Sequence, residues 1–184
     1  MSFFKNLQNL FSAKKESSMP VSTDSPETVP ATDLSEVWQL TDSYEIVSAI
    51  HDRINQKSYY GEHMNRLSYE EQVICICNIL EQEVNNGGFD QFLFNSSGNY
   101  AHRVEECLRA IGADKTADIC RKAFSAYGKP IPQDRTQRQK FMEKMESDRI
   151  TDIFDECDGQ FYEYPDNLEE LCCRYILANK EKFS

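Results

Sequence analysis

Nine carboxylate side chains lie within residues 148–170, and only one basic residue, Arg149, accompanies them. The stretch has a net charge of −8, while residues 41–184 together hold 26 acidic and 17 basic residues, a net charge of −9. Concentrated negative charge attracts basic surfaces and repels nucleic acid phosphates and anionic lipids. We therefore expect a basic protein as partner and no direct binding of nucleic acid. The nine acids are Asp148, Asp152, Asp155, Glu156, Asp158, Glu163, Asp166, Glu169 and Glu170.

Helical spacing places the first of these acids on one surface. At about 100° per residue, one face of a helix carries acids and the opposite face is apolar. The acidic face holds Asp148, Asp152, Asp155 and Glu156, and the apolar face holds Ile150, Ile153, Phe154 and Cys157. If residues 148–170 were wholly helical, they would span about 35 Å with one net charge per roughly 4 Å, against about 3.4 Å per phosphate of one DNA strand. Such a surface resembles a phosphate backbone.

An alternative interpretation of the same acids is a solvated face without a partner. An acidic face opposite an apolar stripe is typical of any surface helix in an acidic protein. Asp166, Glu169 and Glu170 also have a local explanation, because a helix N-terminus favours acidic caps and negative charge. Asp166 and Glu169 have the spacing of an acidic capping box.

The sequence predicts no metal and no cofactor. The seven cysteines lie among apolar residues, include no Cys-x-x-Cys pair, and have no neighbouring histidine at zinc-ligand spacing. Buried free thiols in a reducing compartment are expected instead. Aligning Gly159 with the sixth position of a calcium-binding EF-hand loop places Phe154 first and Pro165 twelfth, where neither can supply a ligand.

Every strong hydrophobic periodicity after Thr41 has the helical value, and no alternating segment indicates a strand. Ser68 and Glu71 form a capping box at the start of one helix, and the glycines at 87 and 88 are expected to end it. Other helices are expected to stop at Gly112 and Gly128 or to begin near Asp134 and Asp166. The predicted fold is all-α, with helices packed around one core.

The N-terminal part differs in composition. Residues 1–15 have the pattern of a short amphipathic helix, for which weak contact with a membrane surface or docking on a partner are both open. Residues 16–40 are rich in Ser, Thr, Pro and acids and predict a disordered linker before a single domain at 41–184. No apolar run of bilayer length or signal peptide is present, so a cytoplasmic location is expected.

Residues 85–98, Asn-Asn-Gly-Gly-Phe-Asp-Gln-Phe-Leu-Phe-Asn-Ser-Ser-Gly, are the most distinctive stretch. Gly87 and Gly88 permit positive φ and a sharp reversal, and the three phenylalanines at 89, 92 and 94 anchor the next turn in the core. Side chains of Asn86, Gln91 and Asn95 are expected to bond loop backbone groups. The alternative is a small-molecule pocket lined by these amides.

This stretch, together with residues 161–170, Phe-Tyr-Glu-Tyr-Pro-Asp-Asn-Leu-Glu-Glu, resembles the bacterial DNA-mimic protein family, whose C-terminal domain also occurs in many proteins of unknown function. The resemblance runs from about Asp42 to Lys180. It implies a compact all-helical domain and, for the member that gives the family its name, an acidic dimer that occupies the DNA-binding face of a transcription regulator. The motif residues interpreted as structural are Asn86, Gly87, Gly88, Phe89, Gln91 and Asn95.

The leading functional prediction is a non-enzymatic acidic binding protein, a DNA mimic that covers the basic DNA-binding surface of a transcription regulator. A ligand-binding or enzymatic helical domain that uses residues 85–95 is the first alternative. An adaptor tethered through residues 1–15 is the second.

Overall fold

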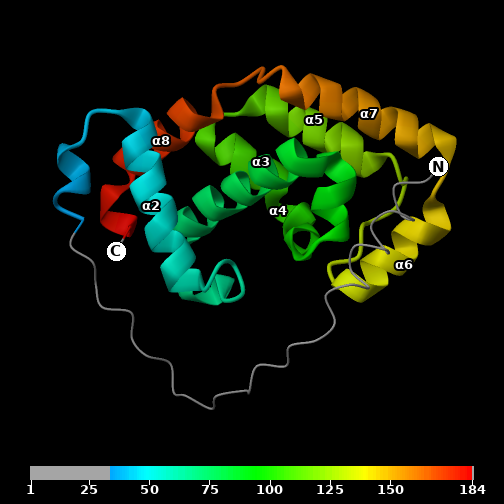
Figure 1. The fold of residues 1–184 in the computed structure, drawn as a ribbon, viewed down its shortest axis with the longest axis horizontal. Helices are drawn as coiled ribbons and strands as arrows, with labels where there is room; N and C mark the ends of the chain where they lie inside the picture. The colour runs from blue at the N-terminus through cyan, green and yellow to red at the C-terminus, as the bar shows by residue number, and fades with distance from the viewer. Residues whose placement is uncertain (1–33, 184) are drawn as a thin grey trace, which may run out of the picture.

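The computed structural model describes residues 34–183, and within them it is all-α, as predicted (Figure 1). The predicted amphipathic helix at 1–15 and the start of the predicted linker, residues 16–33, lie outside the described residues. The α-helices of the described residues are α2 (Ser43–Ser58), α3 (Tyr69–Phe94), α4 (Ala101–Ile111), α5 (Asp114–Ser125), α6 (Arg135–Met145), α7 (Asp148–Tyr162) and α8 (Leu168–Ala178). The 3-10 helices in the same part of the chain are η1 (Val37–Gln39), η2 (Met64–Arg66), η3 (Ser96–Tyr100) and η4 (Lys180–Lys182).

Helix α3 lies at the centre of the fold and contacts α2, α4, α6 and α7. Its start confirms the predicted capping box: the Ser68 hydroxyl accepts from the backbone N–H of Glu71 at 3.1 Å, and the Glu71 carboxylate accepts from that of Ser68 at 2.7 Å. Lys57 of α2 also donates to the buried Glu71 carboxylate at 2.9 Å. The central helix is therefore held at its N-terminus by polar contacts and along its length by core packing.

The glycine pair divides α3 into two helical segments that meet at a kink. Gly87 has extended φ of −170°, and Gly88 has φ 72° and ψ −175°, a conformation that is almost restricted to glycine. After this kink the chain returns to helix as far as Phe94. The regular helix that begins at Ser68 thus ends at the glycines, as predicted, and the sequence did not predict the second helical segment that follows. Phe89 and Phe92 are fully buried and hold this second segment against the core.

Helix α7 lies along one long edge of the molecule beside α5, while α8 lies near α2 at the other end (Figure 1). Its inner face carries the predicted apolar residues, with Ile150, Phe154 and Cys157 buried and Phe161 added one turn later. Phe161 and Phe154 both meet the ring of Phe89. The helix runs through Gly159 to Tyr162, so only residues 163–167 separate α7 from α8.

Arg138 of α6 is fully buried and fastens this helix to the end of α3. Its guanidinium donates to the backbone carbonyls of Leu93, Asn95 and Gln133 at 2.5 to 2.7 Å. Because these acceptors are neutral, the cation is solvated by peptide dipoles instead of a carboxylate, and burial lowers its pKa. Gly98 provides the space for it, since an added Cβ would lie 2.6 Å from its Nε atom.

Packing begins before residue 41. Leu34 is buried, and Trp38 packs against the core with Lys180 over its ring at 5.3 Å. All seven cysteines are buried free thiols, as predicted. Burial raises the pKa of Cys75 and Cys172 to about 12, so these thiols stay protonated at neutral pH. Within residues 34–183, no helix combines the length and apolar character needed to cross a bilayer.

Candidate functional site

The outer face of α7 presents four of the predicted acids to solvent. Asp148, Asp152, Asp155 and Glu156 are all exposed, as their spacing indicated. Helix α7 lies along one edge of the molecule (Figure 1) and spans about 22 Å. Its exposed carboxylates therefore follow one another along this length. The buried face of the same helix fixes the direction of this row relative to α5.

Three further predicted acids that are exposed follow α7 in the chain. Glu163 is exposed in the turn after α7, and Glu169 and Glu170 are exposed in the first turn of α8. The cap of α8 differs from the prediction: the side chain of Asn167 accepts from the backbone N–H of Glu170 at 3.2 Å. The predicted capping box of Asp166 and Glu169 was therefore wrong by one residue.

Asp166 points back to α5 instead of capping α8. Its carboxylate accepts from the backbone N–H of Thr116 at 2.8 Å and from the Thr116 hydroxyl at 3.0 Å. Asp166 is half-buried. It joins the segment before α8 to the start of α5. It is less exposed than the acids named above, and this corrects its predicted placement among the surface acids.

Asp158 is also engaged inside the fold. Its Oδ1 accepts from the backbone N–H of Phe89 at 2.9 Å, directly after the kink at Gly88. Burial and the neighbouring Asp155 raise the pKa of Asp158 to about 6, while the hydrogen bond from Phe89 opposes this rise. The helical spacing could not reveal this role, because the partner of Asp158 lies 69 residues away in the sequence.

One of the seven exposed acids has a basic partner. Glu156 pairs with Lys122 of α5 at 2.5 Å, and this contact lowers the pKa of Glu156. Within residues 34–183, the other six make no ion pair. The six are Asp148, Asp152, Asp155, Glu163, Glu169 and Glu170. We call them the acidic row.

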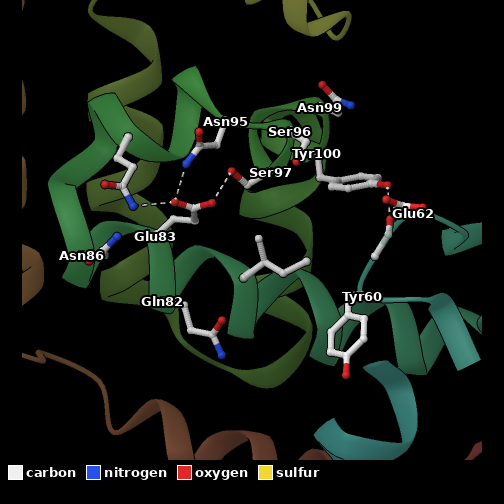
Figure 2. Close-up of a pocket in the computed structure, with 13 residues that line it drawn as sticks. Tyr60, Glu62, Gln82, Glu83, Asn86, Asn95, Ser96, Ser97, Asn99 and Tyr100 are labelled. Atoms are coloured by element: carbon white, nitrogen blue, oxygen red, sulfur yellow. Dashed lines mark hydrogen bonds between the residues drawn. The ribbon is translucent and has the colours of Figure 1, made fainter. Parts of the chain in front are cut away.

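A polar pocket of about 760 Å³ lies on another part of α3 (Figure 2). At its wall, the Glu83 carboxylate accepts from the side-chain amides of Gln91 at 2.7 Å and Asn95 at 2.9 Å, and from the Ser97 hydroxyl at 3.2 Å. The expectation that these amides bond loop backbone groups was therefore wrong for Gln91 and Asn95. The side chain of Asn86 lines the same pocket.

Sequence reasoning missed Glu83, although a signal was available. Glu83 lies one helical turn before the amide-rich segment 86–95, so its carboxylate is the nearest acceptor for amides that fold back after a kink. The residues of the segment then link the two halves of α3. Among the described residues, no group of three or more His, Cys, Asp or Glu side chains is arranged to hold a metal ion.

Most of this chain matches a known protein family. The family model described as DMP19-like protein matches residues 65–179, well over half of the chain. The chain belongs to the DMP19-like family. This confirms the DNA-mimic resemblance seen in the sequence, and at the level of the family the chain is a DNA-mimic protein of a generally non-enzymatic group. Neither the curated proteins nor the solved structures compared with it gave a match.

The DMP19-like match covers the whole acidic row but only part of the pocket lining. It includes all of α3 to α8, and therefore the kink, Glu83 and the whole acidic row. It begins after α2 and the tyrosine-containing turn that follows α2, although the resemblance was expected to start near Asp42. The family relationship thus covers the acidic row and leaves Tyr60, Gly61 and Glu62 of the pocket lining outside it.

Proposed function

We propose that this chain is a non-enzymatic DNA mimic whose acidic row binds the basic DNA-binding surface of a transcription regulator in the cytoplasm. The observation that carries the proposal is the exposure of six carboxylates without an ion pair among the described residues. Carboxylates left without internal partners remain free to contact Lys and Arg of another protein.

Rigidity supports the same function. The row lies on α7 and on the start of α8, and both helices bury their opposite faces in the core. The contact between Asp166 and Thr116 and the contact between Asp158 and Phe89 fix the ends of this surface relative to α5 and α3. A partner therefore meets carboxylates at fixed positions, and little conformational freedom is lost on binding.

Asp158 and Asp166 are half-buried and hold α7 and the start of α8 in place, but they are not part of the acidic row. If both side chains pointed to solvent, α7 would lose its hydrogen bond to Phe89, and the segment before α8 would lose its hydrogen bonds to Thr116. We therefore assign partner contact to the acidic row, with Glu156 at its edge, and assign positioning to Asp158 and Asp166.

The test is affinity capture of DNA-binding proteins from a native cell extract on the immobilised full chain. The triple variant Asp148→Asn, Asp152→Asn, Asp155→Asn removes three charges from the row. The matched control Glu45→Gln, Asp52→Asn, Glu181→Gln removes the same number of charges from exposed acids on α2 and near the C-terminus. We expect the row variant to lose capture and the control to retain it, with circular dichroism showing equal helicity.

Duplex DNA provides the second readout. A partner that uses its DNA-binding surface must release this chain when duplex DNA is added, because both ligands need the same basic residues. Capture that survives in the row variant, or capture that duplex DNA does not displace, would contradict the proposal.

A further inference from the structure

The polar pocket beside α3 is lined by negative charge, which favours a cationic ligand. Among the described residues, its lining includes two carboxylates, Glu62 and Glu83, and no Lys, Arg or His. The remaining polar groups are side-chain amides, hydroxyls and the two tyrosines Tyr60 and Tyr100, and the volume of about 760 Å³ is that of a small-molecule site. Phosphorylated and carboxylate ligands are disfavoured there, because the described lining residues carry negative charge and include no cation to compensate that of the ligand.

Glu83 is held in place by neutral donors alone. Its three hydrogen bonds come from Gln91, Asn95 and Ser97, and Glu83 itself is half-buried. These contacts fix the carboxylate at the pocket wall without cancelling its charge. Such a group offers a cationic ligand an oriented partner in a partly dehydrated setting.

The opposite wall carries the aromatic side chains. In Figure 2, Tyr60, Glu62 and Tyr100 lie on one side of the pocket, and Glu83, Asn86 and Asn95 lie on the other. Tyr60 is 79% exposed and has φ 56°, an unusual conformation for a residue with a side chain. The Tyr100 hydroxyl donates to the backbone carbonyl of Gly61 at 3.1 Å and fastens this turn to η3.

We propose that this pocket binds a small organic polycation of the polyamine class. The ammonium groups of such a ligand pair with the carboxylates of Glu83 and Glu62 on the two walls. Its methylene segments lie against Ile79 and the tyrosine rings, whose faces also attract cations. The side-chain amide oxygens of Gln82 and Asn86 accept from the remaining N–H groups.

The test is isothermal titration of the full chain with spermidine at about 0.15 M salt, where charges more than about 8 Å apart are largely screened. We expect saturable binding with one site per chain. Glu62→Gln, which changes an exposed side chain, and Glu83→Gln each weaken it by at least about tenfold, as expected for the loss of a charged hydrogen bond. Tyr60→Ala weakens binding as well.

The matched control separates the pocket from general attraction to an acidic protein. Asp152→Asn removes one charge from the acidic row, outside the pocket, and should leave spermidine affinity within about twofold. The proposal is overturned if spermidine shows no saturable binding, if Glu62→Gln binds as tightly as the unmodified chain, or if Asp152→Asn weakens binding as much as Glu62→Gln. Because Glu62→Gln leaves the contacts of Glu83 intact, a folding defect of Glu83→Gln cannot decide the outcome.

Discussion

Beside the kink of α3, Asp90 lies close enough to Asp158 for the charge of Asp158 to oppose its ionisation. Burial is the main cause that raises the pKa of each to about 6, and the charge of Asp158 adds to the rise at Asp90. Asp158 gains a hydrogen bond from Phe89 in return, whereas no hydrogen bond to the Asp90 side chain is found among the described residues. Of these two carboxylates, Asp90 is the one whose buried charge is not offset by a hydrogen bond within the described residues.

Replacing Asp90 with asparagine should stabilise the protein at neutral pH. The pKa of Asp90 in the folded state, about 6, exceeds its usual 3.8, so the folded state binds the proton more tightly. Stability should therefore fall as pH rises from about 4 to 6, and the full penalty should remain above pH 6. After allowance for partial exposure, we expect Asp90→Asn to add about 1 kcal/mol at pH 7.

Urea denaturation at pH 7 and at pH 5 measures this effect. The gain from Asp90→Asn should shrink at the lower pH, where the wild-type carboxylate is already largely protonated in the folded state. An equal gain at both pH values would show that the substitution acts through packing and not through charge.

At the scale of the helix, two glycines are in opposite situations, Gly88 at the kink of α3 and Gly159 inside α7. Gly88 has φ 72°, and a Cβ added to it would lie 2.2 Å from Oδ2 of Asp158. Gly159 lies inside α7, where an added Cβ would meet no atom within 4 Å. One position requires glycine and the other does not.

Alanine at these two positions should therefore change stability in opposite directions. We expect Gly88→Ala to destabilise the fold by about 3 kcal/mol or more, because the backbone conformation is strained for alanine and the Asp158 carboxylate must move. We expect Gly159→Ala to stabilise it by about 0.5 to 1 kcal/mol, because alanine favours the helix. Thermal denaturation of both variants tests the pair, and equal tolerance of both substitutions would contradict it.

The sequence allowed the helices to be predicted because their signals are local. The capping box at Ser68, the stop at Gly112 with φ 86°, and the cap at Asp134 all involve residues within one turn of the helix end. The continuation of α3 past Gly88 was missed because it depends on Phe89 and Phe92 packing against distant helices. No local pattern carries that information.

The acids of the candidate surface also divide into those that local periodicity places correctly and those that it does not. Helical periodicity predicted that Asp148, Asp152 and Asp155 face outward, since the apolar stripe fixes the inner face. It failed at Asp158 and Asp166, whose partners Phe89 and Thr116 come from elements far away in the sequence. Charge pattern predicts exposure well only where no backbone donor from another element comes within reach.

At the scale of the whole molecule, several acids outside α7 and α8 are already paired. On α4 and α5, Arg109 contacts Glu105, Asp114 and Asp118 at 2.7 to 3.1 Å, and Arg121 contacts Asp118 at 2.9 Å. Exposed pairs like these add little stability. They do reduce the negative field on that side, so the acidic row dominates the attraction of a basic partner.

The salt dependence of partner binding follows from the spacing of these charges. Helix α7 holds five acids and one base over about 22 Å, or about one net charge per 5 to 6 Å, whereas duplex DNA holds one charge per about 1.7 Å. DNA therefore releases more condensed counterions on binding.

For the DNA-binding protein captured on this chain, we expect the slope of log affinity against log salt to be less than half the slope for duplex DNA. Fluorescence anisotropy between about 50 and 200 mM salt gives both slopes. The row variant should flatten the slope for this chain further, while the Glu45, Asp52 and Glu181 control should not. Equal slopes for the chain and for DNA would mean that the partner meets a much denser array of charges than the acidic row provides.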